Sequence, residues 1–232
     1  GIRDRDVTGV QTCALPILPA EVRLVRGPAQ WQQKPLCQIA GLHDDFDLAF
    51  FLGFHSRAGT PRGLLSHTWA GAIVHEITVN GRVVGETAIN ALLCGGFGVP
   101  VALVSGADDL VAEALADLPE VEVAETKKAL GFNLAECWGP QATAPRIEAA
   151  ARRAVTRHLQ NAFRPWVVSR PVVAELETHR REMTDRMLLA APGLQRIGER
   201  RVRIEAPDVR DALGGLWRGI TEAFHEPSAW LR

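Results

Sequence analysis

Apolar segments of strand length alternate with segments of helical periodicity along most of this 232-residue chain. The strand-length runs cover residues 46–54, 73–79, 82–84, 100–105, 171–176 and 201–205. The helical segments cover residues 86–94, 108–116, 145–163 and 208–224. This alternation is typical of an α/β domain whose sheets are covered by helices. We therefore expect an α/β fold of three layers, with a mixed sheet flanked by helices.

The first seventeen residues stand apart from this pattern. Their back-translation reproduces both constant parts of a widely used sequencing adapter, and only Arg5 and Asp6 occupy the place of its variable index. The reading frame continues into Leu18, because leucine codons that begin with T complete the adapter. A segment of this origin carries no information about the fold of the protein. We interpret residues 1–17 as adapter-derived and expect the natural chain to begin upstream of Leu18.

Charge and cysteine usage exclude several classes of partner. The chain has 26 basic and 27 acidic residues, a formal net charge of −1, which does not favour nucleic acid or an anionic membrane as a partner. An apolar content of 47% is enough for a sizeable core, yet no stretch approaches the ~20 apolar residues that span a bilayer. Beyond the adapter-like segment, Cys37, Cys94 and Cys137 form no CxxC pair, which favours a reducing compartment. We expect a cytoplasmic protein.

Three residues with metal-binding or proton-transfer side chains lie in the first half of the chain. His55 follows the apolar run 46–54, His67 closes the glycine-containing loop 56–66, and Glu86 begins a helical segment. Catalytic and ligand-binding groups commonly lie at the ends of buried strands. Imidazole and carboxylate groups bind Zn²⁺ and leave a position for water, whose pKa the metal lowers toward ~7. Surface histidines and an ordinary first-turn carboxylate fit the same spacing, so the spacing alone does not decide the role.

Other enzyme classes lack their motifs here. The chain contains no GxSxG sequence, so the nucleophile elbow of an α/β serine hydrolase is absent. The glycines at 95–98 follow a helical segment and lack GxGxxG spacing, which favours a helix end over a dinucleotide site. A Gly139-Pro140 break predicts two parts, a metal-site α/β part at 18–139 and a C-terminal α/β part with a loose tail at 140–232.

The sequence around the two histidines and the glutamate resembles the DppA-type D-aminopeptidases, which are zinc metallopeptidases. The resemblance runs from about Leu18 to about Phe224, and its most specific parts are LGFHSRAGTP at 52–61 and ITVNGRVVGETAIN at 77–90. Weaker agreement is found in PVALVSGAD and IEAPD. The resemblance implies a zinc-dependent aminopeptidase that acts on short peptides with D-amino acids at the N-terminus. It also implies a ring-like homo-oligomer.

The resemblance assigns roles residue by residue. The histidine of the family's GxHxR block and the glutamate of its VGE block bind a pair of zinc ions, and they correspond to His55 and Glu86. His67 corresponds to the family's catalytic nucleophile or base. The loop before His67 is one residue longer than in the family, and we place the insertion at Arg62-Gly63. Two zinc ions per subunit are therefore implied for the intact protein.

The chain departs from the family upstream. Family members begin with a strand carrying Asp-x-Glu-Gly, followed by an Asn-Asp-Ser-His-like segment, and we find neither here, so we expect the first strand and helix of the fold to be missing. We interpret His43-Asp44-Asp45 as a solvated turn and not as a replacement. A catalytic zinc normally has three protein ligands plus water. We therefore expect this chain to be inactive, with a non-catalytic oligomerising or peptide-binding subunit as the alternative.

Three further residues have two interpretations each. Arg57 holds a substrate carboxylate or forms an ion pair within the loop. Asn90, one turn after Glu86 on the same helix face, orients that carboxylate or has a surface or capping role. Lys127 matches a family lysine and contacts substrate, or it is a solvated lysine at the start of a helix.

Overall fold

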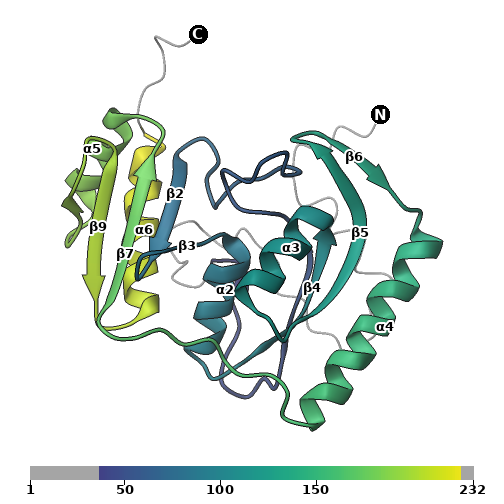
Figure 1. Cartoon of the computed structure of the whole chain (residues 1–232). Coiled ribbons are helices and arrows are strands. Elements are labelled where there is room, and N and C mark those ends of the chain that lie inside the picture. The colour runs from purple at the N-terminus through teal and green to yellow at the C-terminus, as the bar shows by residue number, and fades with distance from the viewer. Residues whose placement is uncertain (1–36, 226–232) are drawn as a thin grey trace.

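The computed structural model describes residues 37–225 and contains two β-sheets flanked by helices (Figure 1). Sheet A contains, in spatial order, β1 (Ala49–Phe54), β4 (Val101–Ala107), β5 (Glu122–Gly131) and β6 (Leu134–Cys137). Sheet B contains, in spatial order, β3 (Arg82–Val83), β2 (Val74–Val79), β7 (Val172–Thr178), β9 (Arg201–Ala206) and β8 (Gln195–Arg196). The helices are the 3₁₀ turn η3 (Cys37–Ile39), α2 (Glu86–Gly95), α3 (Asp108–Asp117), α4 (Pro140–Leu159), α5 (Arg181–Ala190) and α6 (Val209–Ala223). The predicted mixed α/β class is confirmed.

Sheet A forms the middle of three layers. Strands β1, β4 and β5 run parallel, and β6 returns antiparallel to β5. Helix α3 packs on one face, where Leu110 meets Val104, and α4 covers the other, where Ala150 meets Leu103 (Figure 1). Every residue of β4 is buried, as expected for a parallel strand covered on both faces. Its carboxyl end and that of β1 therefore point to the same edge of the sheet.

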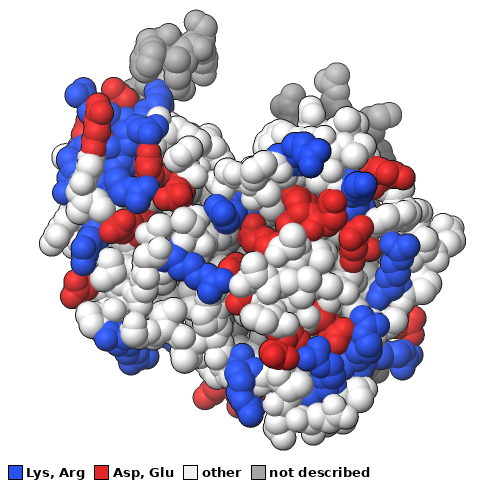
Figure 2. Space-filling model, in the orientation of Figure 1, with Lys and Arg blue, Asp and Glu red and all other residues white. Residues whose placement is uncertain are grey.

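Sheet B is antiparallel and has one apolar and one charged face. Residues of β7 alternate between buried and half-buried positions, and Leu176 packs with Ile204, Leu213 and Ile220 in the largest core cluster. Acidic and basic side chains gather over the strands at the left of Figure 2. There Arg201 forms ion pairs with glutamates of both β2 and β7. Such exposed pairs add little stability, and they make this face a solvated surface.

Helix α2 lies between the two sheets and is buried along its whole length. Ile89 and Leu92 belong to the core of sheet B, whereas Ala91 and Cys94 belong to the core beneath β1 and β4. Apolar side chains on two sides of the helix fit such a central position. Its glycine-rich end at 95–98 confirms the predicted helix stop. Because α2 is held from both sides, its first residue, Glu86, has a fixed position.

The β5–β6 hairpin is the main element that the sequence pattern did not predict. Strand β5 is rich in charged residues, and its stability comes from partners far along the chain. Glu122 accepts hydrogen bonds from Arg153 and Arg157 of α4, each at 2.7 Å. The N–H of Ala129 donates to Asp108 at 2.7 Å. The pattern of neighbouring residues does not reveal these distant contacts. The charged residues of β5 also give no apolar strand signal, so β5 was not predicted.

The predicted bounds of one helix and one strand are wrong, and so is the predicted burial of that strand. Helix α4 runs over Pro140–Leu159 instead of 145–163: it begins at Pro140, which loses no hydrogen bond at the first helical position, and Pro145 lies inside the helix. The run 46–54 contains a strand only from Ala49, and Leu52 of that strand is 55% exposed, not buried. The reason is that β1 lies at the edge of sheet A within residues 37–225.

The predicted division of the chain at residues 139–140 does not coincide with the division between the sheets. Strands β2 and β3, from before this point, pair in the same sheet as β7 and β9, from after it. Helix α4, from after it, packs against sheet A. The domain boundary stays a prediction. None of the helices in the described part is long and apolar enough to cross a lipid bilayer.

Candidate metal centre

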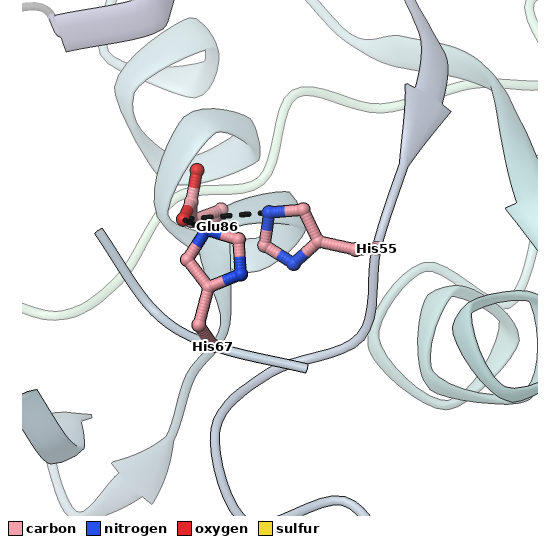
Figure 3. Close-up of side chains that lie close together, drawn as sticks. All are labelled: His55, His67 and Glu86. Atoms are coloured by element: carbon pink, nitrogen blue, oxygen red, sulfur yellow. Dashed lines mark ion pairs between the residues drawn. The ribbon is translucent and has the colours of Figure 1, made fainter. Parts of the chain in front are cut away.

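The fold brings His55, His67 and Glu86 together at one point (Figure 3). His55 directly follows β1, His67 lies in the segment between β1 and β2, and Glu86 opens α2. One possible ligand atom from each side chain lies within 4.8 Å of the others. The three side chains, which the sequence could suggest only as separate candidates, therefore lie close enough to bind one metal ion.

A bulge in β1 directs His55 toward this point. Gly53 adopts φ +73°, and the pairing of β1 with β4 shifts register between Leu52 and Phe54. The Gly53 N–H donates to the Ser105 hydroxyl at 3.2 Å, which anchors the bulge to β4. Bulges re-aim the side chains that follow them, and a positive φ is accessible to glycine at little cost.

The separations within the cluster fit a shared metal ion. The Nε2 atoms of His55 and His67 lie 3.5 and 3.6 Å from Oε1 of Glu86. Two tetrahedral ligands at ~2.0–2.2 Å from zinc are themselves roughly 3.3–3.6 Å apart. The imidazole rings are stacked, with centroids 3.9 Å apart and an angle of 14° between their planes. Both Nε2 atoms thus approach the same carboxylate oxygen at ligand spacing.

Backbone carbonyls fix the orientation of both imidazoles. Nδ1 of His55 lies 3.0 Å from the Ser56 carbonyl oxygen, and Nδ1 of His67 lies 2.7 Å from that of Leu65. A carbonyl only accepts hydrogen bonds, so each Nδ1 must carry the proton. In the neutral ring Nε2 then has a free lone pair. This arrangement is the one that metal-binding histidines use.

Glu86 is a buried carboxylate with neutral hydrogen-bond donors. Its side chain is 2% exposed. The Trp69 N–H donates to Oε1 at 2.7 Å, and the Gln38 amide donates to Oε2. Its place in the first turn of α2 adds the favourable field of the helix N-terminus. Among residues 37–225 the only side chains of basic type within ion-pair distance of Glu86 are the two histidines, which carry no charge in their neutral form. A cation at the cluster would balance this charge, so the residues present fit a zinc ion.

The loop that carries His67 has an unusual backbone. Arg62, Leu65 and Trp69 all adopt positive φ values of 50–57°, which non-glycine residues rarely do. Gly63 packs so closely that a Cβ there would lie 2.6 Å from the Ser56 hydroxyl. Such conformations are found where the surrounding structure holds them, often at functional sites. The predicted insertion point at residues 62–63 lies in this strained part of the loop.

Two pockets meet at the cluster. One, of about 520 Å³, is lined by His55 and Glu86 together with residues of η3 and β1. The other, of about 460 Å³, is lined by His67, His75, His179 and Phe132. Each pocket has enough space for part of a small ligand, and the histidine pair stands between them.

A family model described as D-aminopeptidase, peptidase family M55, matches residues 12–217. The chain belongs to this family. The match begins inside the segment that we interpret as adapter-derived, and that interpretation stays a prediction. A family assignment over most of the chain agrees with the resemblance carried by the histidine and VGE blocks.

Two relatives in this family are similar to the chain. A D-aminopeptidase of Bacillus subtilis (strain 168) is 38% identical over 107 residues, which is 46% of this chain and 38% of that protein. The structure of the Zn-dependent D-aminopeptidase DppA from Bacillus subtilis, a self-compartmentalizing protease, matches with a TM-score of 0.84 at 27% identity. That comparison covers 91% of this chain and 74% of the other chain. The aligned segment spans well under half the length of the curated relative.

Asn90, Arg57 and Lys127, the other residues predicted to belong to the site, lie at different distances from the cluster. The Asn90 amide donates to the Gln38 side chain at 2.6 Å, and Gln38 in turn donates to Glu86, so Asn90 reaches the carboxylate through a second amide. The Arg57 N–H donates to Glu113 of α3 at 2.8 Å. Lys127 lies in β5, opposite Ala107, and the interpretation as a helix-start lysine is wrong.

Two direct partners of the cluster were not predicted from the sequence. Gln38 and Trp69 both donate hydrogen bonds to Glu86, from 48 and 17 positions away in the chain. Trp69 uses its backbone N–H, for which no sequence signal exists. Gln38 lies in a short 3₁₀ turn whose composition is unremarkable. His43, Asp44 and Asp45 form a second group with metal-ligand side chains, but all three are exposed.

Proposed function

We propose that the intact protein is a zinc-dependent aminopeptidase that hydrolyses short peptides with D-amino acids at the N-terminus, and that this chain, in which only two of the family's metal ligands are found, is inactive. The observation that carries the proposal is the cluster of His55, His67 and Glu86. Its two Nε2 lone pairs face one buried carboxylate oxygen at ligand spacing. Family membership and the activities in the names of the two relatives support the same reaction.

His55 and Glu86 hold zinc in this proposal, and the intact protein holds two zinc ions per subunit. Bound zinc supplies a Lewis acid that polarises the scissile carbonyl. His67 acts as the catalytic nucleophile or base. Its Nδ1 proton is held by the Leu65 carbonyl, so Nε2 is the atom that attacks or accepts a proton. The Trp69 N–H and the Gln38 amide keep Glu86 in place while this happens.

The two pockets provide a place for the substrate. We propose that the peptide crosses the histidine pair, with one side of the scissile bond in the pocket beside His55 and the other in the pocket beside His67. Apolar side chains, Phe51 in the first and Phe132 in the second, line these pockets. Walls of this kind suit short peptides with few charges.

Zinc content and turnover measured on the same variants test the assignment. Zinc is measured by elemental analysis on this chain, and turnover with a D-alanyl dipeptide on the intact protein, each for the wild type and for His55→Ala, Glu86→Ala and His67→Ala. We expect the first two variants to lose both zinc and turnover, because ligands are removed. We expect His67→Ala to lose turnover by a larger factor than zinc.

His43→Ala is the matched control, because this exposed histidine belongs to the second group of ligand-type residues. Loss of zinc from His43→Ala, with wild-type zinc in His55→Ala, would move the metal to the exposed turn and contradict the proposal. Equal loss of zinc from all three cluster variants would make His67 a third ligand. Zinc binding without turnover in the intact wild-type protein would favour the alternative of a non-catalytic, peptide-binding subunit.

Assembly and location are further parts of the proposal. The similar structure is described as that of a self-compartmentalizing protease. We propose on this basis that the chain forms a homo-oligomer, which sedimentation at several protein concentrations tests. The cysteine usage supports a cytoplasmic location.

A further inference from the structure

Two carboxylates of α3 contact the loop that carries the candidate metal-site histidines. We infer that Asp109 and Glu113 are positioning residues, which hold residues 56–66 so that His55 and His67 face Glu86. This inference rests on the proposed function, because it concerns the geometry of the same site. Neither residue is a metal ligand in the cluster, and neither was singled out by the sequence pattern.

Asp109 ties the two ends of the loop to each other. Its Oδ2 accepts a hydrogen bond from the Ser56 hydroxyl at 2.5 Å and another from the Leu64 N–H at 3.0 Å. Ser56 directly follows His55, whereas Leu64 precedes His67 by three residues. One carboxylate oxygen therefore fixes the distance between the segments on which the two histidines lie.

Ser56 transmits this constraint to both histidines, through the imidazole of His55 and the backbone of His67. Its side chain is fully buried, and its carbonyl oxygen accepts hydrogen bonds from Nδ1 of His55 at 3.0 Å and from the backbone N–H of His67 at 3.3 Å. The hydroxyl group of the same residue is held by Asp109. A displacement of Ser56 would therefore change the ring orientation of His55 and the backbone position of His67 together.

Glu113 lies one turn further along the same face of α3 and joins the loop to α2. Its Oε2 accepts the Arg57 N–H at 2.8 Å. Its Oε1 lies against Gly85, where a Cβ would be only 2.5 Å away. Gly85 directly precedes Glu86. Glu113 thus contacts both Arg57, which follows Ser56, and Gly85, which precedes Glu86.

The bonding pattern suits positioning better than general stabilisation. Both carboxylates accept from donors within residues 56–64, and the remaining oxygen of each is buried without a hydrogen-bond partner in the described part of the chain. A carboxylate placed only for stability would be expected to use both oxygens. Each acceptor oxygen thus holds a donor of the loop from the rigid helix α3, which suits a role in orienting the loop.

Alanine and isosteric variants of both residues test the inference. Asp109→Ala and Glu113→Ala remove the acceptor, whereas Asp109→Asn and Glu113→Gln keep one carbonyl oxygen in its place. Asp108→Ala is the matched control, because Asp108 also lies on α3 but accepts a hydrogen bond from the Ala129 N–H of β5 and not from the loop. The measurements are amide hydrogen exchange, imidazole NMR and zinc affinity by chelator competition.

The expected results follow from the contacts. Asp109→Ala should speed exchange at the Leu64 amide by about tenfold, and Glu113→Ala at the Arg57 amide, because one hydrogen bond is lost in each. His55 should lose its preference for the Nδ1-protonated form in Asp109→Ala. Zinc affinity should fall by about 10–100-fold, as for residues that orient metal ligands. The isosteric variants should restore these values, and the control should leave them unchanged.

Several outcomes separate this inference from the proposed function. Wild-type exchange, imidazole spectra and zinc affinity in folded Asp109→Ala would overturn the inference alone. Altered spectra and exchange in a chain that shows no peptidase activity would support it while removing the proposed reaction. If Asp109→Ala does not fold, Ser56→Ala removes the donor instead and must shift the same His55 signals. An unchanged His55 spectrum in Ser56→Ala would then overturn the inference.

Discussion

The buried carboxyl group of Glu113 makes the stability of this protein depend on pH in a direction opposite to that of most carboxylates. Burial raises the pKa of Glu113 from 4.5 to about 7, and the nearby charges of Asp117 and Asp109 add to the increase. The hydrogen bond from the Arg57 N–H and the positive charge of Arg57 oppose it. Removal of the charge by Glu113→Gln should therefore stabilise the protein at neutral and alkaline pH.

Proton linkage gives the direction and the size of this change in the free energy of unfolding. Between pH 4.5 and about 7 the folded state holds a proton on Glu113 that the unfolded state has lost. The contribution of Glu113 to the free energy of unfolding is therefore fully present below pH 4.5. It decreases as pH rises and is lost above about pH 7. Each tenfold change in acidity is worth about 1.4 kcal/mol, so the whole effect is at most about 3–4 kcal/mol. Glutamine keeps an acceptor for the Arg57 N–H but carries no charge to desolvate.

Denaturant unfolding of both proteins from pH 4 to pH 8.5 measures this effect. The quantity to compare is the free energy of unfolding of Glu113→Gln minus that of the wild type, because other carboxylates then cancel. We expect this difference to increase by about 2–3 kcal/mol between pH 4.5 and pH 8. Glu136→Gln, an exposed carboxylate of β6, is the control and should show no such trend. A difference for Glu113→Gln that is independent of pH would refute the reasoning.

Two further predictions concern buried groups near the centre of the fold. Burial raises the pKa of the Cys94 thiol to about 12, so a thiol reagent at pH 8 should modify exposed Cys137 and leave Cys94 unmodified until the chain unfolds. Peptide mapping after labelling checks this, and early modification of Cys94 would contradict it. Gly95→Ala should destabilise the protein by about 1–3 kcal/mol, because a Cβ there would lie 1.9 Å from the Trp166 carbonyl oxygen. Gly131→Ala is the control, because a Cβ there would make only an ordinary contact, 3.9 Å from Cβ of Leu134, and equal unfolding midpoints for the two variants would show that the backbone yields.

Local pattern accounts for much of the fold. The apolar runs predicted β1, β4 and β7, and helical spacing predicted α2, α3 and α6, because alternation and 3.6-residue periodicity are properties of neighbouring residues. The β5–β6 hairpin was missed for the complementary reason. Its charged strand is stabilised by arginines of α4 that lie about thirty positions away.

The candidate site shows the same division. The sequence by itself determined the α/β class, the family and the residue types His55, His67 and Glu86, since these depend on short contiguous blocks. Only the tertiary structure decided that the three side chains meet. It also decided that Asp109 holds the histidine loop, and that Gln38 and Trp69 hold the carboxylate. These contacts join residues 17 to 53 positions apart, and backbone donors among them leave no trace in residue type.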